Sequence, residues 1–307
     1  MPDGGVLFVH AHPDDECIAT GGTIARLVAE GVRVDLVTCT DGAEGEIHDP
    51  TLDHEVARPR LAEIRRRELA CSLDALGGDA IAHHLLGYRD SGMMGTAANA
   101  HPESFWQADI GDATRKLVEI VREARPAVIV SYDENGNYGH PDHINAARIA
   151  REAYLASRGQ AWGVARFHEI AFHRESWFGL MTAMRERGIA LPWDFDRVLD
   201  ARPADELNPS NAAALGQVAE KLETGEAWEM DFGRPDAEVT TRVDVSAFID
   251  HKRRSMDCHR TQRQDMGWLL DLPPDLAEQA LRTEHFVLRW LDGDDVPLSR
   301  RETSLFG

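Results

Sequence analysis

The sequence predicts an α/β fold: a Rossmann-like, mostly parallel sheet flanked by helices, with a smaller C-terminal cap region. Short apolar runs of strand length alternate with longer amphipathic stretches through residues 1–175, which is the pattern of successive strand–helix–strand units. Glycines follow several of the amphipathic stretches, as they do at helix ends. The chain of 307 residues is long enough for one large domain or two modest ones.

The predicted elements follow in order from the N-terminus. Residues 6–11 (VLFVHA) form a short buried strand, and an amphipathic helix runs from Thr20 to about Glu30, where Gly31 ends it. Residues 60–76 carry leucine and isoleucine at helical spacing and predict a second helix. The remaining predicted strands are 32–40, 81–86, 127–131 and 167–172, and the remaining helices are 112–124 and one from Pro141 to about Ser157.

The strand–helix pattern weakens after about residue 175. We therefore expect the sheet domain to span 1–175 and a cap and substrate-pocket region, packed on it, to span 176–307. Prolines and glycines in 190–235 predict loop and short helix, and 237–246 (AEVTTRVDVS) alternates like an exposed strand. A helix is expected over 247–259.

Composition excludes some partners. The formal net charge of −20 repels phosphate backbones and anionic lipid heads, so we expect neither a nucleic acid nor a membrane partner. The N-terminus has no basic segment and no long apolar run, so no signal peptide or membrane span is predicted. Four cysteines stand far apart without a paired spacing, which favours a reducing compartment, and the cytoplasm is the expected location.

Two short motifs carry the chemistry. They are His12-Pro13-Asp14-Asp15-Glu16 and His140-Pro141-Asp142-His143, and each follows an apolar strand. Ligands bind beyond the carboxyl ends of parallel strands, so both motifs are expected on one edge of the sheet. Zinc in a hydrolase is usually held by three His and Asp/Glu ligands with one position open to water. His12 and Asp15 on the first loop and His143 on the second are the predicted ligands.

The remaining motif residues suit the other roles of a hydrolase. Asp14 stands beside the metal position without a ligand role, so we expect it to take a proton from water and pass it to the leaving amine. His140, oriented and kept protonated by Asp142, is expected to stabilise the oxyanion, and Tyr138 could donate a further hydrogen bond. Residues 1–175 are therefore the expected metal-binding catalytic domain.

Other interpretations were weighed against this one. One His-Pro-Asp run has little specificity, because these residues are common in turns, but two such runs after two strands are much more specific. A sugar-binding module would need the ligands but not Asp14 and His140. A nucleotide-binding protein is disfavoured, because HPDDE stands where a glycine-rich phosphate loop would be required. A metal-dependent esterase or phosphatase stays open. Cys17 is expected to be a small buried residue.

These motifs resemble the LmbE-like, or PIG-L, family of zinc-dependent de-N-acetylases. The resemblance implies a Rossmann-like fold, one Zn²⁺ held by His12, Asp15 and His143 (with other divalent ions open), and the roles given above for the remaining motif residues. It also implies that Arg65 and Asp90 contact the sugar. The segments that carry it are AHPDDE at 11–16, Gly21-Gly22, TCTDGAEGE at 38–46, the helix with Arg65 and Glu68, RDSGM at 89–93, YDENGNYGHPDH at 132–143 and HKRRSMDCHRTQ at 251–262.

Within this family the chain looks most like the actinobacterial mycothiol-pathway members. One branch deacetylates N-acetylglucosaminyl-inositol, and the other is an amidase of mycothiol S-conjugates. RDSGM and Gly139 resemble the deacetylase branch, whereas YDEN and the segment around His259 resemble the amidase at least as closely; Ala19 stands where the amidase carries lysine. For His259 and Gln262, an exposed helix face and the pocket role that the family resemblance implies fit equally well. We expect a hydrolase of an N-acyl, chiefly N-acetyl, amide on a small amino sugar or glycoconjugate. An S-conjugate amidase, a deacylase of specialised metabolites and a homo-oligomeric state are left open.

Overall fold

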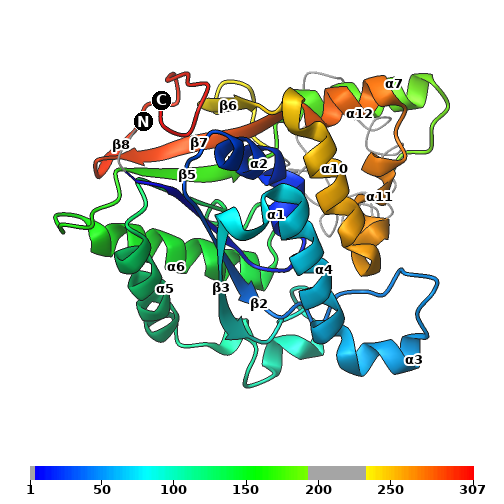
Figure 1. Cartoon of the computed structure of the whole chain (residues 1–307), viewed down its shortest axis with the longest axis horizontal. Helices are drawn as coiled ribbons and strands as arrows, with labels where there is room; N and C mark the ends of the chain where they lie inside the picture. Colours follow the sequence, from blue (N-terminus) through cyan, green and yellow to red (C-terminus); the bar gives the residue numbers. More distant parts are fainter. Residues whose placement is uncertain (1–3, 193–232) are drawn as a thin grey trace, which may run out of the picture.

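The computed structural model describes residues 4–192 and 233–307, which form a sheet between layers of helices (Figure 1). Within these residues the sheet has the order β3-β2-β1-β4-β5-β7-β6, with β8 paired to β7. The strands are β1 (Val6–His10), β2 (Val34–Thr40), β3 (Ile81–Tyr88), β4 (Val128–Ser131), β5 (Arg166–Ala171), β6 (Thr241–Asp244), β7 (Thr283–Leu291) and β8 (Asp294–Asp295).

The α-helices are α1 (Asp15–Ala19), α2 (Gly21–Ala29), α3 (His54–Ala57), α4 (Leu61–Leu76), α5 (Ile110–Ala124), α6 (Pro141–Ser157), α7 (Arg174–Glu186), α10 (Ile249–Cys258), α11 (Arg263–Leu270) and α12 (Pro274–Leu281). Short 3₁₀ helices are η1 (Arg58–Arg60), η2 (Gly78–Ala80), η3 (Ala97–Ala100), η4 (Phe105–Gln107), η5 (Ser246–Phe248) and η6 (Arg260–Gln262).

The predicted fold class is confirmed, because the strands from β3 to β5 are all parallel. Only β7 departs from this direction, running antiparallel to β5, β6 and β8. Strand β1 lies inside the sheet, between β2 and β4. From β1 the chain continues to β2 and from β4 to β5, in opposite directions along the sheet, so the carboxyl ends of β1 and β4 form the switch point where open α/β sheets bind ligands.

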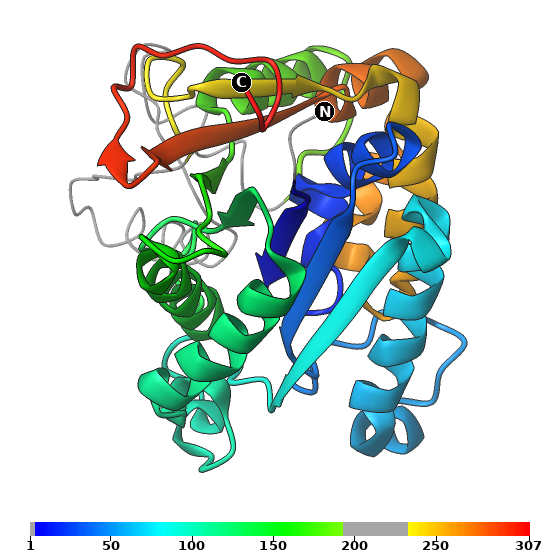
Figure 2. The same cartoon turned by 60° about the vertical axis from the view of Figure 1, so that its left-hand side comes forward.

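Two helical layers cover the sheet. Figure 2 shows α5 and α6 against one face and α2, α4 and α10 against the other. Every residue of β1 and β2 is buried, as expected for central strands of a parallel sheet covered on both faces. Helix α4 turns Leu61, Leu69, Leu73 and Leu76 inward and ends at Gly77, as its spacing predicts.

The C-terminal region contributes strands to the same sheet. β6 and β7 extend it beyond β5, and β7 was not predicted from the sequence. The stretch expected as an exposed strand contains β6, whose Val243 is 3% exposed, so the prediction of exposure was wrong for this residue. A separate apolar cluster joins α7, α11 and α12 through Leu180, Met266 and Leu276, among others. The expectation for 190–235 falls largely outside the described residues.

A disulfide joins helix α4 to helix α10. Cys71 on α4 and Cys258 at the end of α10 are bonded across 187 residues, while Cys17 and Cys39 are buried free thiols. The burial expected for Cys17 is confirmed. Cysteine spacing carries no sign of a bond between residues so far apart, and the bond counts against the reducing compartment expected from that spacing.

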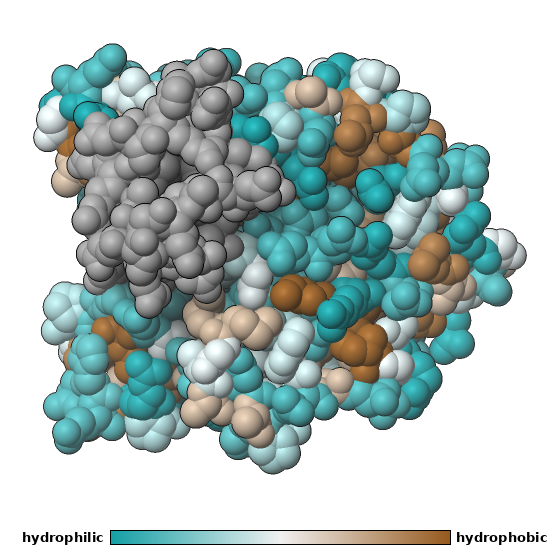
Figure 3. Space-filling view, turned by 180° about the vertical axis from the view of Figure 1, so that it is seen from behind, coloured by the Kyte–Doolittle hydropathy of each residue, from teal (hydrophilic) through white to brown (hydrophobic). Residues whose placement is uncertain are grey.

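The face of the molecule shown in Figure 3 is largely hydrophilic. Hydrophobic residues there occur in separate groups between the hydrophilic ones. In the part of the chain that the structure describes, no helix is long and apolar enough to cross a membrane.

Candidate active site

The loops after β1 and β4 bring three predicted ligands together. His12 Nδ1 lies 3.3 Å from His143 Nε2 and 3.5 Å from an Asp15 carboxylate oxygen, and His143 Nε2 lies 3.4 Å from the other Asp15 oxygen. Tetrahedral ligands held about 2.0–2.1 Å from a zinc ion are roughly 3.4 Å apart. The donor set therefore fits a metal ion of this kind in both its chemistry and its spacing.

The charge states of His143 and Asp15 suit metal binding. Burial lowers the pKa of His143 to about 4, so its imidazole is neutral near pH 7. Burial opposes the charge on Asp15, but His143 and His12 beside it hold the pKa of this carboxyl well below its usual value. A neutral imidazole and an ionised carboxylate are the forms that bind metals. For His12, burial is outweighed by Asp90, Asp142 and Asp15, which raise its pKa well above the usual value, so His12 must release a proton to bind a metal.

The other nitrogen of His12 has a carboxylate partner. Its Nε2 lies 3.2 Å from Asp142 and 3.6 Å from Asp90. The Asp142 carboxylate also accepts hydrogen bonds from the backbone N–H (2.9 Å) and the hydroxyl of Ser91. A carboxylate on the far nitrogen fixes the orientation of a histidine ligand and makes it a stronger base.

This geometry corrects the role expected for Asp142. His140 caps the N-terminus of α6, and its Nδ1 accepts the backbone N–H of Asp142 at 3.1 Å. The Asp142 carboxylate instead points to His12 and Ser91, because the second helical position directs it toward the sheet. Burial, together with His12 and His143, lowers the pKa of His140 well below its usual value. His140 is thus a neutral imidazole, with its proton on Nε2, rather than the protonated form expected.

His140 also stands close to the ligand set. Its ring centroid lies 4.5 Å from that of His12 and 5.3 Å from that of His143. One nitrogen of each of the three imidazoles lies within 4.8 Å of the others. His140 is therefore adjacent to the metal position.

Asp14 has an unusual backbone conformation. Its φ is 128°, a region that non-glycine residues rarely adopt and that is often found at functional sites. The carboxylate accepts a hydrogen bond from Arg65 Nη2 at 2.8 Å. Burial raises the pKa of Asp14 to about 7, against the opposing effect of Arg65. A carboxyl with a pKa near neutrality can both take up and release a proton at physiological pH.

The remaining predicted residues surround this cluster. Arg65 is buried and also donates to the carbonyl oxygens of Pro13 at 2.5 Å and Gly42 at 2.9 Å. Asp90 is buried and accepts the backbone N–H groups of Glu44 and Gly92.

The Tyr138 hydroxyl lies 3.4 Å from His143 Nε2. Every predicted site residue is thus at this edge of the sheet, whereas contact of Arg65 and Asp90 with a sugar stays a prediction.

Comparison with known proteins establishes the family. The family described as PIG-L, GlcNAc-PI de-N-acetylase, matches residues 7–154. The 1D-myo-inositol 2-acetamido-2-deoxy-alpha-D-glucopyranoside deacetylase of Thermobispora bispora is 40% identical over 301 residues, covering 94% of this chain and 89% of the relative. The chain belongs to the PIG-L family. The deacetylase of the same name from Thermobifida fusca is 39% identical over 300 residues, covering 94% of this chain and 93% of its own.

PIG-L membership makes the protein an amide-hydrolysing enzyme, which excludes the non-catalytic sugar-binding module. Solved structures agree on the fold. The N,N'-diacetylchitobiose deacetylase of Pyrococcus horikoshii aligns with a TM-score of 0.51 and 20% identity, covering 96% of this chain and 85% of its own. The 4-carboxy-2-hydroxymuconate hydratase GalB of Pseudomonas putida aligns with a TM-score of 0.56 and 18% identity, covering 93% and 95%. Since a hydratase shares it, the fold alone does not fix the reaction.

Sequence reasoning assigned no role to some residues of this PIG-L site. Glu16 and Ser91 are buried polar residues of this kind. Glu16 accepts the backbone N–H of Asp14, and the backbone N–H of Ser91 donates to Asp142. Glu16 directly follows the first motif, and that position was the signal available. For His259 the exposed helix face is excluded, because the side chain is fully buried. Gln262 is buried too and donates to the Glu46 carbonyl at 2.8 Å.

Proposed function

We propose that this protein is a zinc-dependent deacetylase that hydrolyses the N-acetyl amide of a glucosamine-containing substrate, with N-acetylglucosaminyl-inositol as the first candidate. The observation that supports this most is the convergence of His12, Asp15 and His143 at tetrahedral spacing beside Asp14. The substrate follows from the relatives, whose names specify the acetamido-glucopyranoside of inositol.

The proposed metal ligands are His12, Asp15 and His143, and zinc is the first choice because nitrogen and carboxylate ligands suit it. A bound zinc ion would polarise the amide carbonyl and lower the pKa of a water molecule. Other divalent ions can use the same ligands, so the identity of the metal is part of the proposal.

The residues of the chain handle the protons. As a water oxygen bonds to the carbonyl carbon, Asp14 takes the proton that the water loses. His140 donates Nε2–H to the carbonyl oxygen as negative charge develops there, and Tyr138 adds a second hydrogen bond. When the C–N bond breaks, its electron pair stays on nitrogen, and Asp14 returns the proton to it. The products are acetic acid and the free amine, and the proton that the acid loses protonates the amine or water.

Arg65 and Asp90 are proposed to contact the sugar, and residues 176–307 are proposed to form the cap that shapes the pocket beside the 1–175 catalytic domain. We also propose a small-molecule partner only, with neither nucleic acid nor membrane. The cytoplasm remains the proposed location, and the Cys71–Cys258 disulfide is the feature against it. Trapping thiols in intact cells before purification tests this, because a cytoplasmic protein should yield both cysteines in the reduced form.

The decisive test is the release of free amine and acetate by purified, zinc-loaded protein. Three substrates separate the candidates: N-acetylglucosaminyl-inositol, a simple N-acetylglucosamine glycoside and a mycothiol S-conjugate. We expect the first to have the highest kcat/KM and metal-stripped protein to be inactive until zinc is restored. A preference for the S-conjugate would make the protein an amidase of that branch. Full activity after exhaustive chelation would exclude the metal-dependent mechanism.

A further inference from the structure

A buried carboxylate next to the metal ligands has no role in the proposed chemistry. Glu16 is 1% exposed, and both of its oxygens have partners. One oxygen lies 2.7 Å from His259 Nε2 and also accepts the Ser72 hydroxyl. The other accepts the backbone N–H of Asp14 at 2.9 Å. Glu16 therefore connects a distant histidine to the backbone of the proposed base.

The contact with Asp14 is made where the backbone is strained. A φ of 128° costs free energy for a residue with a side chain and persists only when surrounding contacts enforce it. The hydrogen bond to Glu16 fixes the amide at one end of that residue, and the Arg65 contact fixes the carboxylate at the other. Loss of the first contact would let the Asp14 backbone relax and displace its carboxylate.

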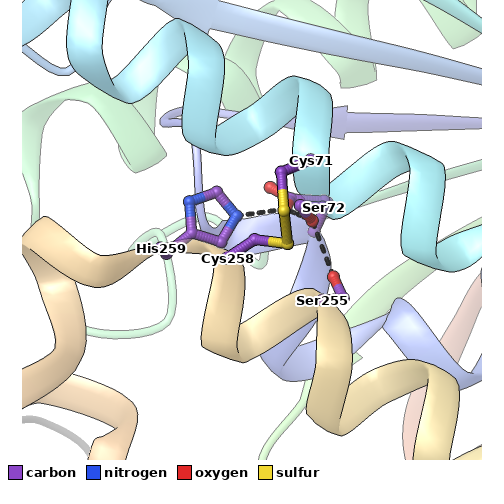
Figure 4. Close-up of a disulfide and its surroundings, with 6 residues drawn as sticks. Cys71, Ser72, Ser255, Cys258 and His259 are labelled. Carbon is purple, nitrogen blue, oxygen red and sulfur yellow. Dashed lines mark hydrogen bonds and ion pairs between the residues drawn. A yellow bond between two sulfur atoms is a disulfide. The ribbon is translucent and has the colours of Figure 1, made fainter.

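His259 is well placed to hold Glu16. It directly follows α10, is 0% exposed, and belongs to a segment fastened to α4. Figure 4 shows the disulfide between Cys71 and Cys258 bridging the two helices beside the His259 ring.

Two further contacts fasten the same segment. Ser72 and Ser255 face each other at 2.6 Å beside the disulfide (Figure 4). Thr261 adds hydrogen bonds from its backbone and its hydroxyl to Glu68 on α4, at 2.8 and 2.6 Å.

We propose that Glu16 and His259 form a positioning pair that holds the Asp14 backbone in its positive-φ conformation and so sets where the Asp14 carboxylate lies relative to the metal ligands. This inference rests on the proposed function, in which Asp14 is the base. The pair acts through Asp14 and does not touch the substrate.

A second metal site is the competing explanation, because Glu16, Cys17 and His259 also bring ligand atoms within 4.8 Å of one another. The Glu16–His259 separation of 2.7 Å is that of a hydrogen bond and is much shorter than the roughly 3.4 Å between tetrahedral zinc ligands. The thiol of Cys17 is directed to the carbonyl oxygen of Asp14 at 2.9 Å. The geometry therefore supports the hydrogen-bonded pair.

The chain offers a matched control at Glu284. This carboxylate is 3% exposed, accepts two backbone N–H groups (Gly22 and Thr23) and pairs with Lys252 of α10 at 2.6 Å. It repeats the arrangement of Glu16, with Lys252 of α10 in the place of His259, which directly follows that helix, but it holds α2 rather than Asp14. Glu284→Gln thus perturbs a comparable buried network whose hydrogen-bond partners, Gly22, Thr23 and Lys252, are not among the proposed site residues.

The test compares His259→Leu, His259→Gln and Glu284→Gln with the wild type for kcat, KM, metal content and thermal stability. Leucine removes the donor to Glu16. Because small misplacements of a reacting group slow catalysis, we expect kcat to fall about 10- to 100-fold, while KM and metal content stay within about twofold of the wild-type values. Glutamine can still donate to Glu16 and should restore most of kcat. Glu284→Gln should leave kcat within about threefold of wild type.

Two results would overturn the pair: His259→Leu with kcat near that of the wild type, or an equal loss of kcat in Glu284→Gln. If His259→Leu does not fold, Glu16→Asp replaces it, since it keeps the charge but withdraws the carboxylate by one methylene group. If the wild type itself hydrolyses no substrate, the proposed function fails. Crystal structures of the variants then test the positioning role without any activity. An Asp14 φ that stays positive in both His259→Leu and Glu16→Asp contradicts this role, and a relaxed φ supports it.

Discussion

The two His-Pro-Asp loops contain nearly the same residues but are held in place by different means. The first follows β1 immediately, and its Asp14 adopts a positive φ with its backbone and side chain held by Glu16 and Arg65. The second ends at the N-terminus of α6, where His140 is the N-cap and Pro141 the first helical residue. The first loop is therefore held by Arg65 and by Glu16, which is itself bonded to the distant His259, whereas helix geometry maintains the second loop.

This difference corresponds to different roles proposed for the two loops. A helix N-terminus sets side-chain directions through its own backbone, which here directs His143 to His12 Nδ1 and Asp142 to His12 Nε2. In the proposed mechanism the first loop presents a ligand and a base from consecutive residues, and its Asp14 has the unusual backbone conformation. Substitutions in the two loops should therefore fail in different ways.

The largest loss of activity is expected from the proposed metal ligands, which both loops supply. Asp15→Ala and His143→Ala each remove one of three proposed ligands, so both should lose bound metal and lower kcat/KM by more than about 10³-fold. Elemental analysis and the deacetylase assay on the purified variants measure this. If either variant kept one equivalent of metal, its loop would not supply a ligand, and the proposal that both loops bind the metal would be contradicted.

The next effect distinguishes the neighbours on the first loop. Asp14→Asn keeps the shape of the side chain but cannot accept a proton, so turnover should fall by about 10²- to 10⁴-fold while the metal stays bound. Metal content and kcat, set against those of Asp15→Ala, provide the measurement. Loss of the metal in Asp14→Asn would mean that the roles of the pair have been exchanged.

The second loop should show a milder and different loss. Asp142→Asn weakens the acceptor on His12 Nε2, and because outer partners tune metal ligands, zinc affinity should fall about 10- to 100-fold. Competition with a fluorescent chelator measures the affinity. Ser91→Ala, which removes the hydroxyl donor to Asp142 but leaves the carboxylate, is the control and should have a smaller effect. Unchanged affinity in Asp142→Asn would show that His12 does not need this partner.

The smallest effect on activity is expected from the disulfide near the first loop. Replacing Cys71 and Cys258 with serine should lower the free energy of unfolding by about 2–5 kcal/mol, since a long loop is no longer closed in the unfolded chain. We expect kcat to change less than about threefold, because Glu68 still holds the segment through Thr261. Denaturant unfolding with and without reductant provides the comparison, and identical curves would contradict a stabilising bond.

Much of the fold was predictable, because its central strands are short segments rich in apolar residues that alternate with longer amphipathic helices. The strand expected at 6–11 is β1 (Val6–His10), and the helix expected at 60–76 is α4. β7 was missed because charged residues interrupt its apolar pattern. Its Glu284 is buried and neutralised by Lys252, a pairing that no local pattern reveals.

By itself the sequence determined the parallel sheet, the two motif loops at one edge and the set of residues gathered there, since the alternation of strands with helices and the positions of the motifs can be recognised along the chain. Only the tertiary structure decided which partner each polar atom takes. It directed Asp142 to His12 instead of His140, joined Cys71 to Cys258, and buried His259 against Glu16. These pairings join residues up to 243 positions apart, and because hydrogen bonds and burial depend on distances in space, spacing along the chain cannot specify them.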